Sequence, residues 1–164
     1  MDAKHTIDIQ WAISRRPDFP NNGKIRRWLT PAICALHDRP VEILVRIVAT
    51  DEMAELNSTW RGKSGPTNVL SFPSNIEDEQ GRYLLGDLVI CADVVVAEAE
   101  AQRKDVAAHF CHMLVHGMLH LSGFDHVLEA QAEEMERLER QLLAELNFPD
   151  PYLVRPENEG NSNE

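Results

Sequence analysis

The chain has 164 residues, a mass of 18.6 kDa and a formal net charge of −11, and 43 % of its residues are apolar. This length and composition are typical of a globular protein, and they exclude a chain that is disordered throughout. The longest unbroken apolar runs have five residues, whereas a helix that crosses a bilayer needs about 20. We therefore expect no membrane-spanning segment.

The N-terminal residues and the cysteines indicate the cellular compartment of the protein. The first residues show neither the basic region nor the apolar region of a secretory signal. The three cysteines, Cys34, Cys91 and Cys111, are odd in number and have no CxxC spacing, so they do not predict a disulfide framework. We expect a cytoplasmic protein with reduced thiols.

The acidic charge is concentrated at the C-terminal end. Residues 127–164 hold ten Asp and Glu against three Lys and Arg. An overall isoelectric point near 5.0 argues against a protein that coats nucleic acid through many phosphate contacts. It does not exclude a nuclease with a local basic rim. We expect the Glu-rich last helix to lie away from any RNA path and to face protein partners, including its residues Glu133, Glu134, Glu136 and Glu139.

The first half of the chain predicts two strands, each followed by a helix. His5–Trp11 and Val41–Val48 alternate apolar and polar residues, which is typical of half-buried strands. Asn21 and Asn22 are candidate caps for a helix that runs to about His37. We expect Thr50 to cap a second helix, which carries acidic residues in its first turn.

The middle of the chain predicts a loop and two further strands. Residues 61–66 have a loop composition, with two glycines and a proline. A short strand over Asn68–Phe72 is expected to end at Pro73. A turn-like acidic stretch, residues 74–81, then leads to a strand over Tyr83–Ile90.

The remainder predicts three helices. They are expected over Ala92–Arg103, from an Asp105 cap to about Ser122, and along a stripe of helical period formed by Leu128, Ala132, Met135, Leu138, Leu142 and Leu146. This order predicts an α+β fold with a small mixed sheet of about four strands packed with helices, and a helical C-terminal half. We expect a single domain over residues 1–156 and a disordered tail over 157–164.

A cluster of histidines is the most informative feature of the sequence. Five of the seven histidines lie within residues 109–126, and His109, His112, His116 and His120 share one helical stripe about 80° wide. Helical residues four apart can place two imidazoles on one metal ion, so the spacing alone allows His112 with His116 or His116 with His120.

Gly123 favours the second of these pairs. It stands three residues past His120, where a glycine can end the helix in the left-handed conformation and turn the chain back. That turn would bring His126 to His116 and His120. Three histidine ligands and an open fourth position are typical of a catalytic zinc site. For His109 and His112 we expect partly buried helical histidines with ordinary hydrogen bonds.

This spacing equals that of the metzincin peptidases, with one difference. Those enzymes carry a glutamate after the first histidine as general base, and here that position is Gly117. A peptidase on this frame would lack its proton acceptor. Zinc still lowers the pKa of its bound water towards about 7, and an arginine fork suits the phosphate of a phosphodiester. A metal-dependent hydrolase that acts on phosphodiester bonds is therefore favoured, with a zinc peptidase as the alternative.

Three signatures give the sequence a likeness to a known family. The run from His116 to His126 (HGMLHLSGFDH) resembles the zinc motif of the YbeY family of bacterial endoribonucleases, the rRNA maturation factors. Arg61–Pro73 (RGKSGPTNVLSFP) resembles its second signature and Gly86–Ile90 a third, and the ending Asp150–Tyr152 also fits. Many members carry Asp where this chain has Asn68, a change that keeps a hydrogen-bond acceptor.

The resemblance implies a zinc-dependent endoribonuclease specific for single strands. It would act in 16S rRNA 3′-end maturation and in ribosome quality control, with one zinc ion on His116, His120 and His126 and with the small ribosomal subunit and assembly proteins as partners. A functional arginine of the family maps onto Arg61, to which we assign binding and polarising of the scissile phosphate; Lys63 would add a phosphate contact.

Two questions stay open at this level. Asp125 and Asp87 are both candidates for orienting a ligand imidazole. A further alternative is a metal-containing ribosome assembly factor whose nuclease activity is weak.

Overall fold

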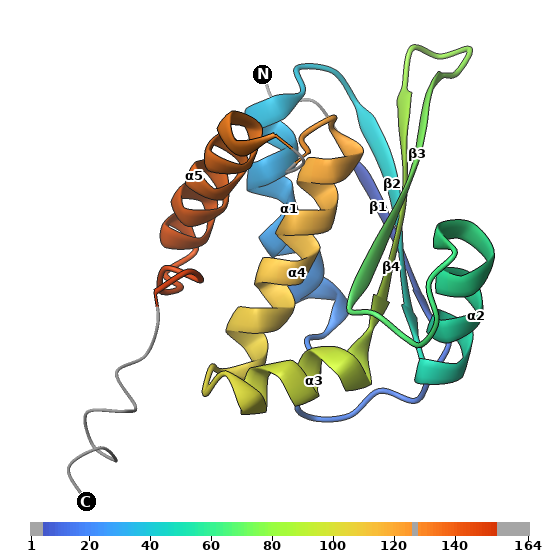
Figure 1. Ribbon diagram of the computed structural model, residues 1–164. Coiled ribbons are helices and arrows are strands. Elements are labelled where there is room, and N and C mark those ends of the chain that lie inside the picture. The colour runs from blue at the N-terminus through green and yellow to red at the C-terminus, as the bar shows by residue number, and fades with distance from the viewer. Residues whose placement is uncertain (1–4, 126–127, 154–164) are drawn as a thin grey trace, which may run out of the picture.

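The computed structural model describes residues 5–125 and 128–153, which form a four-stranded mixed sheet packed with helices (Figure 1). The strand order is β1-β2-β4-β3, in which β1, β2 and β4 are parallel and β3 is antiparallel to β4. The strands are β1 (Thr6–Trp11), β2 (Val41–Val48), β3 (Val69–Glu77) and β4 (Tyr83–Cys91). The helices are α1 (Asn22–Leu36), α2 (Thr50–Arg61), α3 (Ala92–Ala101), α4 (Val106–Leu121) and α5 (Glu129–Glu145). The predicted α+β fold with a mixed four-stranded sheet is confirmed.

The helices lie on both faces of the sheet, and α4 is the central one. Between Phe110 and Leu119 only His116 is not fully buried, because α4 is packed against the sheet, α1, α3 and α5. On β2 the predicted apolar face is confirmed, since Val41, Ile43, Val45 and Ile47 are buried in the main core. A smaller core around Met53 lies between α2 and the opposite face of the sheet. The edge strand β3 therefore runs between α2 and α4.

The predicted helix starts are partly correct. Asn21 caps α1 as expected, since its side-chain oxygen accepts a hydrogen bond from the Lys24 amide at 2.8 Å. The prediction that Thr50 caps α2 is wrong. Ala49 holds the N-cap position without a side-chain bond, and Thr50 is already inside the helix. Asp105 occupies the N-cap position of α4, but its side chain makes no capping hydrogen bond.

The third strand does not end at Pro73, as the sequence predicted, but continues to Glu77. Proline has no amide hydrogen to donate, so it interrupts the hydrogen bonds of a central strand. An edge strand tolerates proline, and β3 is an edge strand. The register of β3 against β4 shifts between Pro73 and Ile76, where Asn75 has a positive φ of 54°. Part of the stretch interpreted as a turn is therefore strand.

None of the described helices is long and apolar enough to cross a membrane. The predicted domain limit at residue 156 and the tail 157–164 lie outside the described residues and stay predictions.

Candidate metal centre

The predicted histidine stripe is present on α4, and its members are not equally spaced. The ring centroids of His109 and His112, and those of His112 and His116, are 6.2 Å apart. Those of His116 and His120 are 4.7 Å apart, the shortest separation along the stripe. The structure thus brings together the pair that Gly123 favoured.

His109 and His112 are buried and bonded to carboxylates from other helices. His109 is 4 % exposed, and its Nε2 lies 2.9 Å from Glu98 Oε1. His112 is 7 % exposed, and its Nε2 lies 3.2 Å from Glu139 Oε1. Both agree with the expectation of helical histidines with ordinary hydrogen bonds.

Gly123 ends α4 in the way that the sequence predicted. Its φ is +102°, its amide donates to the His120 carbonyl, and the Phe124 amide donates to the Leu119 carbonyl, each at 3.0 Å. This pair of bonds is the Schellman motif, which reverses the chain after a helix. The predicted third ligand, His126, follows this turn but lies outside the described residues.

A cleft of about 730 Å³ brings the predicted site residues together. His116 and His120 of α4 line it, and so do Arg61 and Lys63 from the end of α2 and the loop after it. The Arg61 guanidinium donates from Nη2 to the Ser71 carbonyl at 3.0 Å, which fixes it beside β3. Two imidazoles and two cations from segments more than 50 residues apart thus share one cavity.

Glu139 of α5 is the site residue that sequence reasoning missed. Its side chain is fully buried, and its Oε2 lies 2.5 Å from His116 Nδ1. Burial by itself would raise the pKa of this carboxyl, but the hydrogen bonds from His112 and His116 lower it to about 2, so the group stays ionised. The expectation that Glu139 points away from the site was wrong. In the sequence, Glu139 lies at helical spacing from Met135 and Leu142, which are both buried, and this spacing was the signal that could have predicted its burial.

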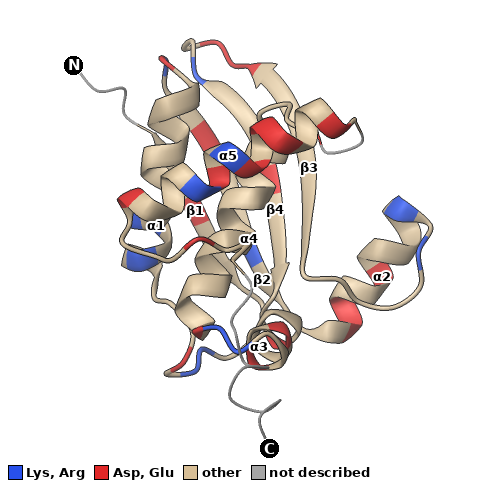
Figure 2. Ribbon diagram, turned by 60° about the vertical axis from the view of Figure 1, so that its left-hand side comes forward, with Lys and Arg blue, Asp and Glu red and all other residues tan. Residues whose placement is uncertain are grey.

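The other acidic residues of α5 differ from Glu139 in being exposed or half-buried. Figure 2 shows acidic residues along α5, interspersed with basic ones, and the basic end of α2 apart from this helix. The expectation that these residues, including Glu133, Glu134 and Glu136, lie away from an RNA path stays a prediction.

Two arrangements in the described residues suit a metal ion. Nitrogen and oxygen atoms of His112, His116 and Glu139 all lie within 4.8 Å of one another and could hold an ion directly. In the second arrangement Nδ1 of His116 is hydrogen-bonded to Glu139. The ion would then bind Nε2 of His116 and a ring nitrogen of His120. Metal-ligating histidines ordinarily donate their second ring nitrogen to a carboxylate, so the His116–Glu139 bond fits this second arrangement.

The two aspartates considered for orienting a ligand lie in different places. Asp125 lines the cleft, just after the turn at Gly123. Asp87 lies on β4, where burial raises its pKa. The carboxylate that contacts His116 comes instead from α5.

Gly117 stands at the position where the metzincin peptidases carry their glutamate, and here it has a packing role. A Cβ at this position would lie 2.7 Å from Leu88 Cδ2 and 3.1 Å from Val69 Cγ2. A side chain at this position would press against β3 and β4, and glycine itself offers no general base. This finding disfavours the peptidase alternative.

We expect Gly117→Ala to destabilise the protein by about 1–3 kcal/mol, because an extra methyl group overpacks the contact between α4 and the sheet. Urea denaturation would measure the change. Gly23→Ala is the matched control, since its Cβ would meet its nearest neighbour at an ordinary 3.4 Å. Equal stability of both variants would contradict the close packing.

The chain is similar to known proteins in both sequence and fold. The family model described as Endoribonuclease YbeY matches residues 18–147. A protein of Dichelobacter nodosus (strain VCS1703A) named Endoribonuclease YbeY is 46 % identical over 153 residues, which cover 91 % of this chain and 99 % of that protein. A Thermotoga maritima protein solved in solution is similar in fold, with a TM-score of 0.55 and 23 % identity over 90 % of this chain and 99 % of that one. The chain therefore belongs to the YbeY family of endoribonucleases, hydrolases that cleave RNA.

Proposed function

We propose that this protein is a zinc-dependent endoribonuclease that cleaves single-stranded RNA in the cleft between α2 and α4. The observation that carries the proposal is the shared cleft, in which His116 and His120 are lined up with Arg61 and Lys63. One side of this cavity offers nitrogen ligands, and the other offers the cations that an RNA phosphate needs.

His116, His120 and His126 would hold the ion. Zinc accepts neutral imidazole nitrogens, and the left-handed conformation of Gly123 supports the proposal that His126 joins the first two. When bound, the ion supplies Lewis acidity, which lowers the pKa of a water molecule towards about 7.

Arg61 would bind and orient the scissile phosphate. Its Nη2 is held by the Ser71 carbonyl, and the planar fork matches two phosphate oxygens while it stabilises the charge that develops on them. Lys63 would contact a phosphate as a point charge. Together they would fix the register of the RNA backbone in the cleft.

The substrate would be ribosomal RNA, and the reaction would take place in the cytoplasm. Similarity to the family supports 16S rRNA 3′-end maturation and ribosome quality control as the process, with the small ribosomal subunit and assembly proteins as partners. We expect the acidic residues of α5 to lie away from the RNA path and to face protein partners.

The proposal is tested by incubating the purified protein with single-stranded RNA, duplex RNA and casein. We expect zinc in the protein by metal analysis, cleavage of single-stranded RNA only, loss of cleavage with a chelator and recovery when zinc is restored. Cleavage of casein alone would support the peptidase, and cleavage that resists the chelator after zinc has been removed would refute the metal-dependent mechanism.

A further inference from the structure

The C-terminal segment Asp150–Tyr152 resembles the family's ending, but the proposed chemistry gives it no role. In the structure it follows α5 and packs against α4. The Tyr152 amide donates to Asp150 Oδ1 at 2.8 Å, which closes a tight turn. Lys104 Nζ donates to the Pro151 carbonyl at 2.6 Å, and Arg140 Nε lies 3.3 Å from Asp150 Oδ2. These contacts hold the segment in one place.

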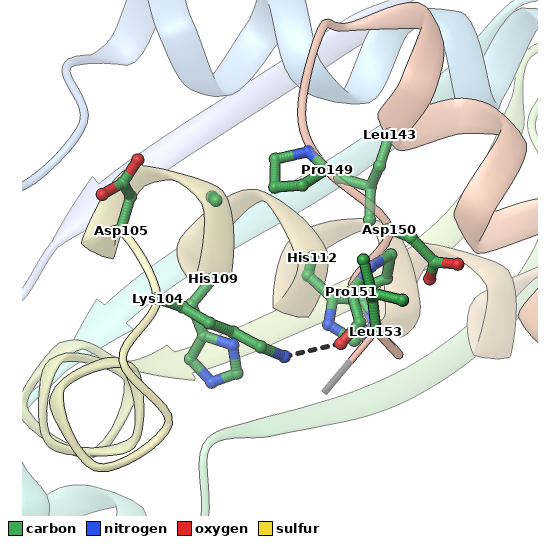
Figure 3. Close-up of a pocket in the computed structure, with 10 residues that line it drawn as sticks. Lys104, Asp105, His109, His112, Leu143, Pro149, Asp150, Pro151 and Leu153 are labelled. Carbon is green, nitrogen blue, oxygen red and sulfur yellow. Dashed lines mark hydrogen bonds between the residues drawn. The ribbon is translucent and has the colours of Figure 1, made fainter. Parts of the chain in front are cut away.

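Figure 3 shows how this segment meets the buried histidines. Pro151 lies by His112, Lys104 lies by His109, and the dashed line marks the bond from Lys104 to the Pro151 carbonyl. Pro149 and Asp150 also line the pocket at this place. The pocket is small and largely apolar, and Leu143 of α5 also lines it. The segment is thus part of the wall behind the histidine stripe.

Tyr152 reaches from this segment to the carboxylate behind His116. Its hydroxyl donates to Glu139 Oε1, and its ring meets the ring of His112 edge-on with centroids 5.3 Å apart. Burial and the neighbouring Glu139 raise the pKa of Tyr152, so the hydroxyl keeps its proton and acts as a donor. Arg140 lies 5.3 Å from the centre of the same ring.

The hydrogen bonds around Glu139 decide which nitrogen of His116 carries the proton. A carboxylate oxygen accepts hydrogen bonds, so a neutral His116 that donates to Glu139 carries its proton on Nδ1 and has its lone pair on Nε2. A neutral His112 bonded through Nε2 likewise leaves Nδ1 unprotonated. That atom is buried without a hydrogen-bond partner among the described residues, as expected of an acceptor rather than a donor.

We propose that Glu139 and Tyr152 are positioning residues of the metal centre: Tyr152 fixes the carboxylate, and the carboxylate fixes the tautomer and the direction of the His116 ring. The inference rests on the proposed function, since it presumes an ion at His116. It gives the C-terminal segment a role in metal affinity although none of its atoms contacts the ion. The catalytic groups remain those of the cleft.

Glu139→Gln tests the carboxylate. A glutamine offers one acceptor and one donor group, so it cannot accept from both histidines, and its amide can force the His116 proton onto Nε2. We expect the affinity of the full chain for zinc, measured by competition with a chromophoric chelator, to fall about 10- to 100-fold. A two-bond ¹H–¹⁵N spectrum of the zinc-free protein should show His116 protonated on Nδ1 in the wild type and a shift towards the other tautomer in the variant.

Tyr152→Phe tests the second step and removes only one oxygen atom. Glu139 keeps both histidine contacts, so we expect a smaller loss of zinc affinity, of up to about tenfold. Tyr152→Phe also tests the positioning role if Glu139→Gln does not fold. The matched controls are Glu134→Gln, an exposed residue of α5 that pairs with Arg137, and Tyr83→Phe, whose hydroxyl bonds Asn75 at the β3–β4 hairpin. Both should keep the zinc affinity of the wild type.

The outcomes separate this inference from the proposed function. If the wild type binds zinc and both test variants bind it as tightly as their controls, the positioning role is overturned while the proposed function stands. If His120→Ala leaves zinc affinity unchanged while Glu139→Gln abolishes it, Glu139 is itself a ligand and the positioning role is again overturned. If the wild type binds no zinc, the proposed zinc site and this inference fail together.

Discussion

Replacing His120 by alanine is expected to abolish zinc binding in the cleft and to reduce the cleavage of single-stranded RNA below about one thousandth of the wild-type rate. The reason is the loss of one of the two described imidazoles that line the cleft. A bound zinc ion would lower the pKa of a water molecule, so without the ion that pKa would rise back towards the value of bulk water and hydroxide would be scarce at neutral pH. Zinc affinity and single-turnover cleavage, measured on the same preparation, would check both effects.

Two variants of the same helix serve as comparisons for His120→Ala. His109→Gln changes a histidine of the same stripe that is bonded to Glu98 and does not line the cleft, so zinc binding should persist. His112→Ala distinguishes the two possible ion positions. If His112→Ala abolishes zinc binding and His120→Ala does not, the ion lies in the cluster with His116 and Glu139, and the proposed site is wrong.

Replacing Arg61 by alanine is expected to lower the cleavage of single-stranded RNA about 100- to 1,000-fold while zinc affinity is unchanged. Arg61 contacts the Ser71 carbonyl and lines the cleft, so its loss removes a charge that faces the phosphate. Removing one preorganised donor from a developing charge has an effect of this size. The rate constant kcat should fall more than KM rises, because the contact strengthens in the transition state.

Three further variants delimit this effect. Arg61→Lys should recover only part of the activity, since an ammonium group cannot bind two phosphate oxygens as a fork. Lys63→Ala should have the smaller effect of a single exposed charge. Arg137→Ala on α5, which pairs with Glu134, is the control that should leave cleavage unchanged. Undiminished cleavage by the double variant Arg61→Ala, Lys63→Ala would refute the phosphate-binding role.

Predictions that depended on neighbours along the chain were largely confirmed. The alternation of β2, the histidine stripe on α4 and the end of that helix at Gly123 follow from the strand period, the helix period and the left-handed conformation that glycine accepts. Such features need only a few consecutive residues. The prediction that Thr50 caps α2 was wrong because the N-cap, Ala49, is only one residue away. The sequence pattern is compatible with a helix that begins at either position.

Features that depend on contacts between distant segments were decided by the tertiary structure. Whether Pro73 ends β3 depends on its being an edge strand, which the strand order alone decides. That Arg61 and His116 line one cleft depends on α2 and α4 packing on opposite faces of the sheet.

The sequence by itself was enough to identify the family signatures and the histidine pair, because short motifs and helical periodicity are local properties. It did not reveal that Glu139, on a helix that otherwise appears solvated and acidic, turns its carboxylate to His116 and Tyr152. A buried charge is stable only where donors surround it, and those donors come from α4 and from the C-terminal segment. Only the packing of these elements against one another brings them together.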